Sequence, residues 1–317
     1  MKVQKVKFPL DIEQIDFPPL AMALGYFDGV HRGHQQVILE AKRQALAYGL
    51  QSAVMTFDPH PSVVLGKSNT NVQFITPLAQ KIRIIEKLGI DYLFIVDFTT
   101  EFASLLPQEF VDQYLIRFNV KHVVAGFDFT YGRMGKGTME TLPFHSREQF
   151  TFTVVPKFTE ENEKVSSTRI RTLIKAGKMD ELPPLLGRYY TTSGHVVGGD
   201  QRGRTIGFPT ANVDTNSGYI LPPVGVYAVR MNVNNRWYNG VCNVGYKPTF
   251  HKELLKQTVE VHLFDFNQDI YGEEVVIEWH TYLRSEQKFA GIDELVAQIN
   301  KDKQNSIAYF EENRQTS

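Results

Sequence analysis

The sequence predicts two domains of different class: an α/β domain with a parallel sheet, then an antiparallel sheet or barrel that ends in a helix. Three observations carry this prediction. The 317 residues are about twice the length of a typical domain. Short apolar runs alternate with helix-like stretches as far as about Ile174. After Gly187 the chain becomes rich in β-branched and aromatic residues.

The first half consists of segments that suit strands and helices in turn. In chain order these segments are "LAMALGYF", "HQQVILEAKRQALAYG", "QSAVMTF", "LAQKIRIIEKLGI", "DYLFIVDF", "PQEFVDQYLIRFN" and "VKHVVAGFDF". Such an alternation predicts a parallel sheet that helices cover on both faces. Ligands of these folds bind at the carboxyl ends of the strands.

The second half consists of short strand-like segments with turns between them. They are "YYTTSGHVV", "VYAVRMNV", "RWYNGVCNVG", "TVEVHLFDF" and "EEVVIEWHTYL", and they predict an antiparallel sheet or barrel. A final helix from about Ile292 to Glu312 has a regular apolar face of Leu295, Ile299, Ile307 and Phe310. Because Pro183 and Pro184 interrupt the link between the halves, we expect domains over residues 1–183 and 184–317.

Composition excludes several classes of protein. The 34 basic and 35 acidic residues nearly balance, so we expect no general nucleic-acid or membrane binding, although a small anionic ligand fits. The single cysteine, Cys242, excludes an intramolecular disulfide and a cysteine zinc cluster, and we expect it to be a buried apolar residue. Since no apolar run approaches the ~18 residues of a membrane helix, we expect a cytoplasmic protein. We also expect a monomer.

The segment "GYFDGVHRGH" joins the first expected strand to the first helix. His31 and His34 therefore lie at a helix N-terminus, whose backbone N–H groups and dipole favour anions. Glycines at 25, 29 and 33 let a phosphate approach the backbone, and two imidazoles could donate to its oxygens as charge develops. The alternative is a pair of solvated turn histidines, which the pair alone would favour and the whole pattern does not.

The same segment resembles the first motif of the nucleotidylyltransferase superfamily, whose HxGH signature binds the phosphates of ATP or CTP. More narrowly, it resembles the adenylyltransferase module of the bacterial bifunctional riboflavin kinase/FAD synthetases. The resemblance implies a Rossmann-like domain in which His31 and His34 are catalytic. It also implies that the nucleotide is bound by Gly25, Phe27, Asp28 and Gly33.

Two further segments resemble that module. "VAGFDFTYGRMGKG" implies that Gly126, Asp128 and Phe129 lie near the flavin phosphate and the nucleotide. "VSSTRIRTLIKAG" resembles the second nucleotide motif, with Ser166, Ser167 and Thr168 as a hydroxyl-rich helix cap and an apolar face of Ile170, Leu173 and Ile174. Arg169 and Arg171 could then reach the β- and γ-phosphates, and Arg171 is implied to be catalytic. Taken alone, such a segment would be a solvated helix start.

The second half contains "SGHVVGGDQRGRTIGFPTANV", five glycines and two arginines before a proline turn. Glycine-rich loops can surround phosphates with amides, and Thr and Asn oxygens can hold magnesium. The alternative is a hairpin loop. "GFPTAN" resembles the signature of the riboflavin kinase module, an antiparallel β-barrel. The resemblance implies magnesium at Thr210 and Asn212, and a nucleotide site that comprises Gly199, Arg204, Gly207, Pro209, Thr210 and Asn212.

Downstream, "TVEVHLFDF" places Glu260 where the resemblance implies the carboxylate that accepts the riboflavin 5′-hydroxyl proton. By its pattern alone Glu260 would be an exposed strand residue. The segment "LRSEQKF" resembles the part that closes over the flavin and implies flavin binding by Arg284, Glu286 and Phe289.

The resemblance covers nearly the whole chain and implies two reactions joined by FMN. Riboflavin takes the γ-phosphoryl group of ATP to give FMN, and FMN attacks the α-phosphorus of a second ATP to give FAD and pyrophosphate. The chain departs from the family where it has Gly198 and Gly199 in place of His-Gly, and where Tyr246 and Lys247 replace an arginine. We expect these changes to alter affinity and not to abolish activity.

Two other functions are alternatives. A superfamily enzyme with another substrate, such as a cytidylyltransferase or a pantetheine-phosphate adenylyltransferase, would leave the C-terminal motif unexplained. A flavin-sensing regulator that recruits RNA or a protein would be expected to lose catalytic groups or gain a basic stripe, and the sequence has neither feature.

Overall fold

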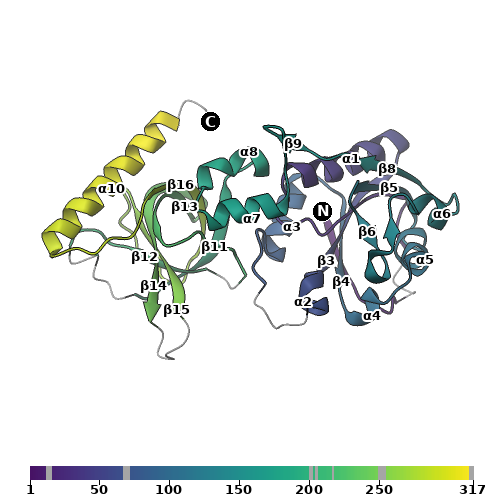
Figure 1. Ribbon diagram of the computed structural model, residues 1–317, viewed down its shortest axis with the longest axis horizontal. Helices are drawn as coiled ribbons and strands as arrows, with labels where there is room; N and C mark the ends of the chain where they lie inside the picture. Colours follow the sequence, from purple (N-terminus) through teal and green to yellow (C-terminus); the bar gives the residue numbers. More distant parts are fainter. Residues whose placement is uncertain are drawn as a thin grey trace. The chain divides into compact units, whose positions relative to one another are not determined.

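A computed structural model describes residues 1–11, 16–66, 72–199, 203, 206–215, 218–248 and 255–313 of the chain (Figure 1). The chain divides into two compact units, Met1–Ser167 and Thr168–Ser317. The boundary that the sequence predicts between residues 183 and 184 stays a prediction about where the two activities divide.

The first unit is built on a six-stranded sheet in the order β1-β4-β3-β2-β5-β8. Every pairing in it is parallel, which confirms the predicted sheet. The central strand β2 is buried at every position, so both of its faces are covered, as its continuous apolar run requires. The strands are β1 (Lys2–Val6), β2 (Leu20–Leu24), β3 (Gln51–Asp58), β4 (Tyr92–Asp97), β5 (Val120–Gly126) and β8 (Thr151–Val155).

Helices cover both faces of this sheet and form two cores. One core contains Val37 and Ile38 of α1 (Arg32–Tyr48) and Ile85 of α3 (Leu78–Lys87). The other contains Phe102 and Tyr114, from the short helices on the opposite face. Those are α4 (Thr100–Ala103), α5 (Pro107–Phe110) and η2 (Val111–Ile116). The described residues of the unit also contain α2 (Pro61–Leu65) and α6 (Leu142–Ser146).

Smaller elements surround the carboxyl edge of the sheet and lead into the second unit. Two short hairpins pair β6 (Thr130–Tyr131) with β7 (Gly137–Thr138), and β9 (Thr159–Glu160) with β10 (Glu163–Lys164). A 3-10 turn, η3 (Arg133–Gly135), lies between the first two strands. After them come α7 (Ser167–Lys175), η4 (Met179–Glu181) and α8 (Pro183–Leu186).

The second unit is a closed antiparallel barrel in the order β11-β12-β15-β14-β13-β16, as predicted. Cys242 lies fully buried in it. The last helix, α10 (Ile292–Glu312), has the predicted bounds and packs on the outside of the barrel (Figure 1). Its Ile307 packs against Val226 and Val241. The barrel strands are β11 (Tyr190–Val197), β12 (Ala211–Thr215), β13 (Gly225–Val233), β14 (Arg236–Pro248), β15 (Leu255–Leu263) and β16 (Glu274–Arg284).

Candidate functional site

The turn between β2 and α1 has an unusual backbone. Phe27, Gly29 and Val30 have φ angles of 55°, 86° and 38°, all in the left-handed region. Glycine adopts this region freely, whereas a bulky or β-branched residue does so only when its surroundings enforce it. Val30 and Phe27 are both buried. The turn is therefore held in a strained form by what packs around it, which is typical of functional sites.

His31 and His34 come together at the start of α1. His31 caps the helix, because its Nδ1 accepts a hydrogen bond of 3.2 Å from the backbone N–H of His34. The two rings stack with centroids 3.5 Å apart, and the Phe27 ring meets His34 edge-on at 5.3 Å. Since Nδ1 of His31 is the acceptor, the proton of its neutral ring lies on Nε2, which makes that atom a donor.

The electrostatics of this pair favour an anionic ligand. Burial lowers the pKa of His34 well below its ordinary value, and the nearby charges of His31, Lys81 and Lys164 lower it further. The Nδ1 atom of His34 is buried with no hydrogen-bond partner among the described residues. A phosphate beside the ring would offset the positive charges and favour proton uptake by His34.

Two glycines of the turn leave space that a side chain would fill. A Cβ on Gly25 would lie 2.7 Å from the ring of Phe27. A Cβ on Gly33 would lie 3.3 Å from the ring of His31 and 3.5 Å from Phe158. Both positions therefore set the placement of the rings around them, which agrees with the importance that the sequence assigns to them.

Asp28 ties the turn to other segments of the first unit. Its carboxylate is almost fully buried and accepts hydrogen bonds from the backbone N–H groups of Thr76 at 3.0 Å and Ile75 at 3.3 Å. Its carbonyl accepts from the Oγ of Ser167 at 2.9 Å, so the first residue of α7 is anchored on the turn. Direct nucleotide binding by Asp28 stays a prediction.

The other residues of the second nucleotide motif flank the unit division. Ser166 precedes α7, while Thr168, Arg169 and Arg171 belong to the second unit. The predicted apolar face of the helix is buried, which confirms Ile170, Leu173 and Ile174 as packing residues. Phosphate binding by the hydroxyls and arginines of this motif stays a prediction.

The segment that follows β5 lies next to residues 25–31 between β2 and α1, which we call the histidine turn. Leu24 of β2 is opposite Ala125 of β5, so the turn and the residues from Gly126 onward leave the same edge of the sheet. Asp128 is exposed and forms an ion pair of 2.8 Å with Lys164 of β10. Phe129 packs on the core, and its ring stacks near Tyr131 at 6.2 Å. The structure thus brings this predicted segment beside His31 and His34.

Two residues of the site were not singled out from the sequence. Thr56 of β3 and Lys81 of α3 both donate to the carbonyl of Tyr26, at 2.8 and 2.7 Å. A signal for Lys81 was present, because it lies one helical turn before buried Ile85 and so occupies an apolar face. No comparable signal marks Thr56 in its apolar strand.

In the barrel, Glu260 lies between two asparagines. On adjacent strands Asn212 of β12 and Asn243 of β14 are both directly opposite Glu260 of β15. Asn243 is two residues from Val241, which contacts the α10 cluster, so these side chains share the outer face of the barrel. The sequence did not indicate Asn243, because strand register is needed to place it.

A cavity of about 560 Å³ lies next to the proline turn, a volume that suits a small-molecule ligand. Its strand residues Ala211 and Val261 alternate with Asn212 and Glu260 along the chain and so face the opposite side of the barrel wall. Thr210 and Pro209 line it together with Ala211, Val261, Phe266 and Tyr271. The carbonyl of Pro209 is hydrogen-bonded to Nδ1 of His262 at 2.8 Å, which fixes the proline turn. The predicted nucleotide residues Pro209 and Thr210 therefore border a real cavity.

The glycine-rich loop is described only in part. Gly199 lies so close to Asn212 that a Cβ would collide with the Asn212 side-chain amide. Gly207 has a φ of 84°, which favours glycine there. Arg204 and the side chain of Lys247 lie outside the described residues.

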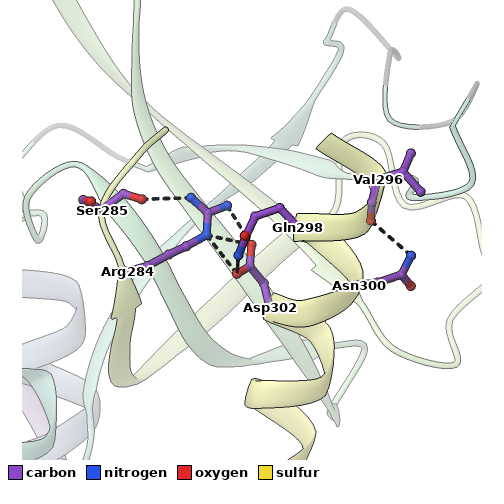
Figure 2. Close-up of polar contacts among 6 residues, drawn as sticks. All are labelled: Arg284, Ser285, Val296, Gln298, Asn300 and Asp302. Atoms are coloured by element: carbon purple, nitrogen blue, oxygen red, sulfur yellow. Dashed lines mark hydrogen bonds and ion pairs between the residues drawn. The ribbon is translucent and has the colours of Figure 1, made fainter. Parts of the chain in front are cut away.

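The predicted flavin segment separates into two environments. The Oε1 of Glu286 lies 3.3 Å from the position that a Cβ on Gly245 would take, beside Asn243. Arg284 instead grips Asp302 of α10 with Nε and Nη2, at 2.8 and 2.7 Å, as Figure 2 shows. Phe289 lies under the Arg284 guanidinium at 5.9 Å. Glu286 is therefore near Asn243, whereas the Arg284 guanidinium contacts α10 and the Phe289 ring. Flavin binding by these three residues stays a prediction.

Metal-binding side chains do not form a cage among the described residues. Across the ranges that the structure covers, no group of three or more His, Cys, Asp or Glu side chains is placed to hold a metal. The predicted magnesium ligands, Thr210 and Asn212, offer neutral oxygens, and Thr210 lines the cavity. Mg²⁺ is usually held by one or two protein oxygens together with substrate phosphates, so this donor set fits a phosphate-bound magnesium.

No helix in the described part of the chain has the length and apolarity to cross a membrane.

Comparisons with known proteins match the two halves of the chain to two different family models. A family model described as FAD synthetase matches residues 14–169, and one described as riboflavin kinase matches residues 186–310. Proteins named bifunctional riboflavin kinase/FMN adenylyltransferase are 53% identical in Bacillus subtilis (strain 168) and 47% identical in Listeria monocytogenes, each covering 98% of both chains. A solved structure described as a macrolide-efflux protein from Streptococcus pneumoniae has a TM-score of 0.89 and 36% identity, over 96% of this chain and 99% of that one.

Proposed function

Because the chain belongs to the family of bifunctional riboflavin kinase/FMN adenylyltransferases, we propose that it makes FMN from riboflavin and then FAD from FMN, with ATP as the donor in both steps. The observation that carries the proposal is the presence of both family domains in one chain that is alignable with its relatives almost end to end. The efflux description belongs to the pneumococcal protein and forms no part of the proposal, because the two domains account for both halves of this chain.

Riboflavin phosphorylation takes place at the barrel. Glu260 accepts the proton of the 5′-hydroxyl as that oxygen attacks the γ-phosphorus of ATP, and ADP leaves. Asn212 and Asn243, opposite Glu260 on both sides, orient its carboxylate and the substrate hydroxyl. The nucleotide occupies the cavity lined by Pro209 and Thr210. From the family resemblance we also assign Gly199, Arg204 and Gly207 to nucleotide binding. Glu286 and Phe289 bind the flavin.

Thr210 and Asn212 would hold the magnesium ion together with the phosphates of ATP. Bound there, the ion would supply positive charge that stabilises the transferring phosphoryl group. The protein's own part is to orient the nucleophile, to carry away its proton and to keep the nucleotide in the cavity.

FMN adenylylation takes place in the domain that the sequence predicts over residues 1–183. The FMN phosphate attacks the α-phosphorus of ATP, and pyrophosphate leaves. Its nucleophile is already an anion, so catalysis consists of positioning and charge stabilisation by His31 and His34 at the N-terminus of α1. The low pKa of His34 supports this role, because a ring kept neutral before binding can take up a proton as phosphate charge arrives. Gly25, Phe27, Gly33, Ser166, Thr168 and Arg171 bind ATP, and Gly126, Asp128 and Phe129 bind FMN.

We expect the chain to act as a monomer in the cytoplasm, where ATP is available. A chromatographic time course of the purified protein with riboflavin, ATP and magnesium tests the proposal, followed by the same run from FMN. We expect FMN first and FAD after it in the first run, and FAD alone in the second. Riboflavin that yields no FMN would refute the kinase assignment, and FMN that yields no FAD would refute the adenylyltransferase assignment.

A further inference from the structure

Lys81 is a buried lysine whose hydrogen-bond partners are Tyr26 of the histidine turn and Thr56, which itself donates to Tyr26. It lies on α3 with 2% of its surface exposed, which is unusual for a lysine. Its Nζ donates to the carbonyl of Tyr26 at 2.7 Å and lies 3.3 Å from Oγ1 of Thr56. The ammonium also sits 4.0 Å from the centre of the Tyr26 ring. Tyr26 is thus held by its carbonyl and by its ring at once.

Two carboxylates near this ammonium favour its charged form. Burial lowers the pKa of Lys81 to about 8, while Asp28 of the turn and Asp58 at the end of β3 act in the opposite direction. Asp58 in turn faces Asp97 and Lys5. The Lys81 charge also reaches His34, since it contributes to lowering the pKa of that ring. Lys81 is therefore linked electrostatically to the histidine pair.

The segment before α3 grips the turn at a second point. The backbone N–H groups of Ile75 and Thr76 bind the Asp28 carboxylate, while Lys81 binds the Tyr26 carbonyl. Between these two anchors lies Phe27, with its φ of 55°, and Val30 follows at 38°. Positive φ angles at such residues persist only where the surroundings enforce them. Loss of one anchor would let the turn relax and shift the rings that follow it.

We infer that Lys81 is a positioning residue for adenylyl transfer: it holds the Tyr26 carbonyl so that the turn aims His31 and His34 at the phosphates. The inference rests on the proposed function of the first unit. Lys81 is buried beneath the turn and acts through it, with no contact to substrate required. Its loss should therefore lower the rate of FAD formation more than it weakens FMN binding.

Lys81→Met and Lys42→Met form a matched pair of variants. Lys42 of α1 also donates to a backbone carbonyl, that of Leu88 at the far end of α3, at 2.9 Å. In the full chain we expect Lys81→Met to reduce kcat for FAD formation about 100-fold, with the KM for FMN changed by less than about threefold. FMN formation at the barrel of the same chain and both activities of Lys42→Met should stay within about twofold of wild type.

A kcat for FAD formation in Lys81→Met within about threefold of wild type would overturn the inference, as would an equal loss in Lys42→Met. The wild-type chain supplies a second measurement that does not depend on a variant that folds. Between about pH 7 and about pH 9.5, deprotonation of Lys81 should lower kcat for FAD formation at least about fivefold, whereas Lys81→Arg, which keeps its charge, should remove this fall.

A wild-type kcat that is flat over that range would also overturn the inference. The proposed function fails separately, and the inference with it, if wild-type protein makes no FAD from FMN at any pH. FAD formation by wild type together with an unaffected Lys81→Met would leave the proposed function intact and remove only the role of Lys81.

Discussion

Asn212 and Glu260 lie directly opposite each other on neighbouring antiparallel strands, and Asn243 meets Glu260 from the other side. One carboxylate is thus placed between two neutral amides on the outer face of the barrel. An amide can orient a carboxylate without cancelling its charge, which leaves the oxygen able to accept a proton. The arrangement suits a general base.

Glu260→Gln tests that base with almost no change in shape. Without an ionised oxygen to accept the hydroxyl proton, FMN formation should fall by about 10²–10⁴-fold. FAD formation from FMN, in the other unit, should be unaffected. Chromatographic initial rates on both substrates measure the split. Glu274→Gln, on the exposed start of β16, is the matched control and should retain both activities. A Glu260→Gln enzyme that still phosphorylates riboflavin at a wild-type rate would rule out the assignment.

Gly33→Ala separates stability from activity in the first unit. Alanine favours a helix by about 1 kcal/mol over glycine, so the thermal stability should stay the same or rise. The new Cβ would nevertheless lie 3.3 Å from the ring of His31, which must shift. Because small displacements at a reacting site are costly, FAD formation should fall at least about tenfold. Thermal unfolding and initial rates on FMN measure the two effects. An active, equally stable variant would show that the ring placement is not critical.

Acidity should destabilise the first unit through His34. Its pKa is lower in the folded chain than the value of about 6.5 expected when unfolded, so between the two values the unfolded chain binds more protons. The contribution is therefore complete above about pH 6.5 and is lost as the pH falls toward the folded pKa. His122, whose pKa burial also lowers, acts in the same direction.

Urea denaturation of the wild type and of His34→Gln at several pH values below neutrality measures this effect. The variant should show a shallower loss of stability on acidification, because one of the linked groups is gone. Equal slopes for the two proteins would mean that His34 titrates alike in both states.

Asp302→Ala should release α10 from the barrel. Asp302 is almost fully buried and receives Arg284 and also Gln298, at 2.8 Å, from its own helix (Figure 2). Removing one partner of a buried ion pair leaves the other uncompensated, which costs about 3–5 kcal/mol. Thermal unfolding of the barrel should show this loss. Asp293→Ala, at the exposed start of α10, should leave it unchanged. Unaltered unfolding of Asp302→Ala would show that Arg284 is as well solvated without its partner.

The fold could be predicted from the sequence wherever the order of apolar residues within one segment shows which of its faces are buried. The continuous apolar run of β2 predicted a strand buried on both faces, and the apolar repeat of α10 predicted its bounds. The two histidines could be placed because a strand, a glycine turn and a helix follow one another without a break.

The rest depends on contacts between distant segments. Lys81 meets Tyr26 across 55 positions of sequence, and Asn243 meets Glu260 only through strand register. The ion pair of Arg284 with Asp302, 18 positions later on α10, is likewise a contact that no local motif reveals. Flavin binding by Arg284 stays a prediction. A motif indicates which residues matter, but it does not say whether one of them touches a ligand or holds its neighbour.

The most direct test of two separate sites on one chain is complementation between His31→Ala and Glu260→Gln. Each purified variant is given riboflavin, ATP and magnesium, alone and then mixed with the other, and flavins are followed by chromatography. We predict that His31→Ala stops at FMN, that Glu260→Gln leaves riboflavin unchanged but converts added FMN to FAD, and that the mixture makes FAD from riboflavin. The account would be contradicted if either variant lost both FMN formation and FAD formation. It would also be contradicted if both variants kept both reactions.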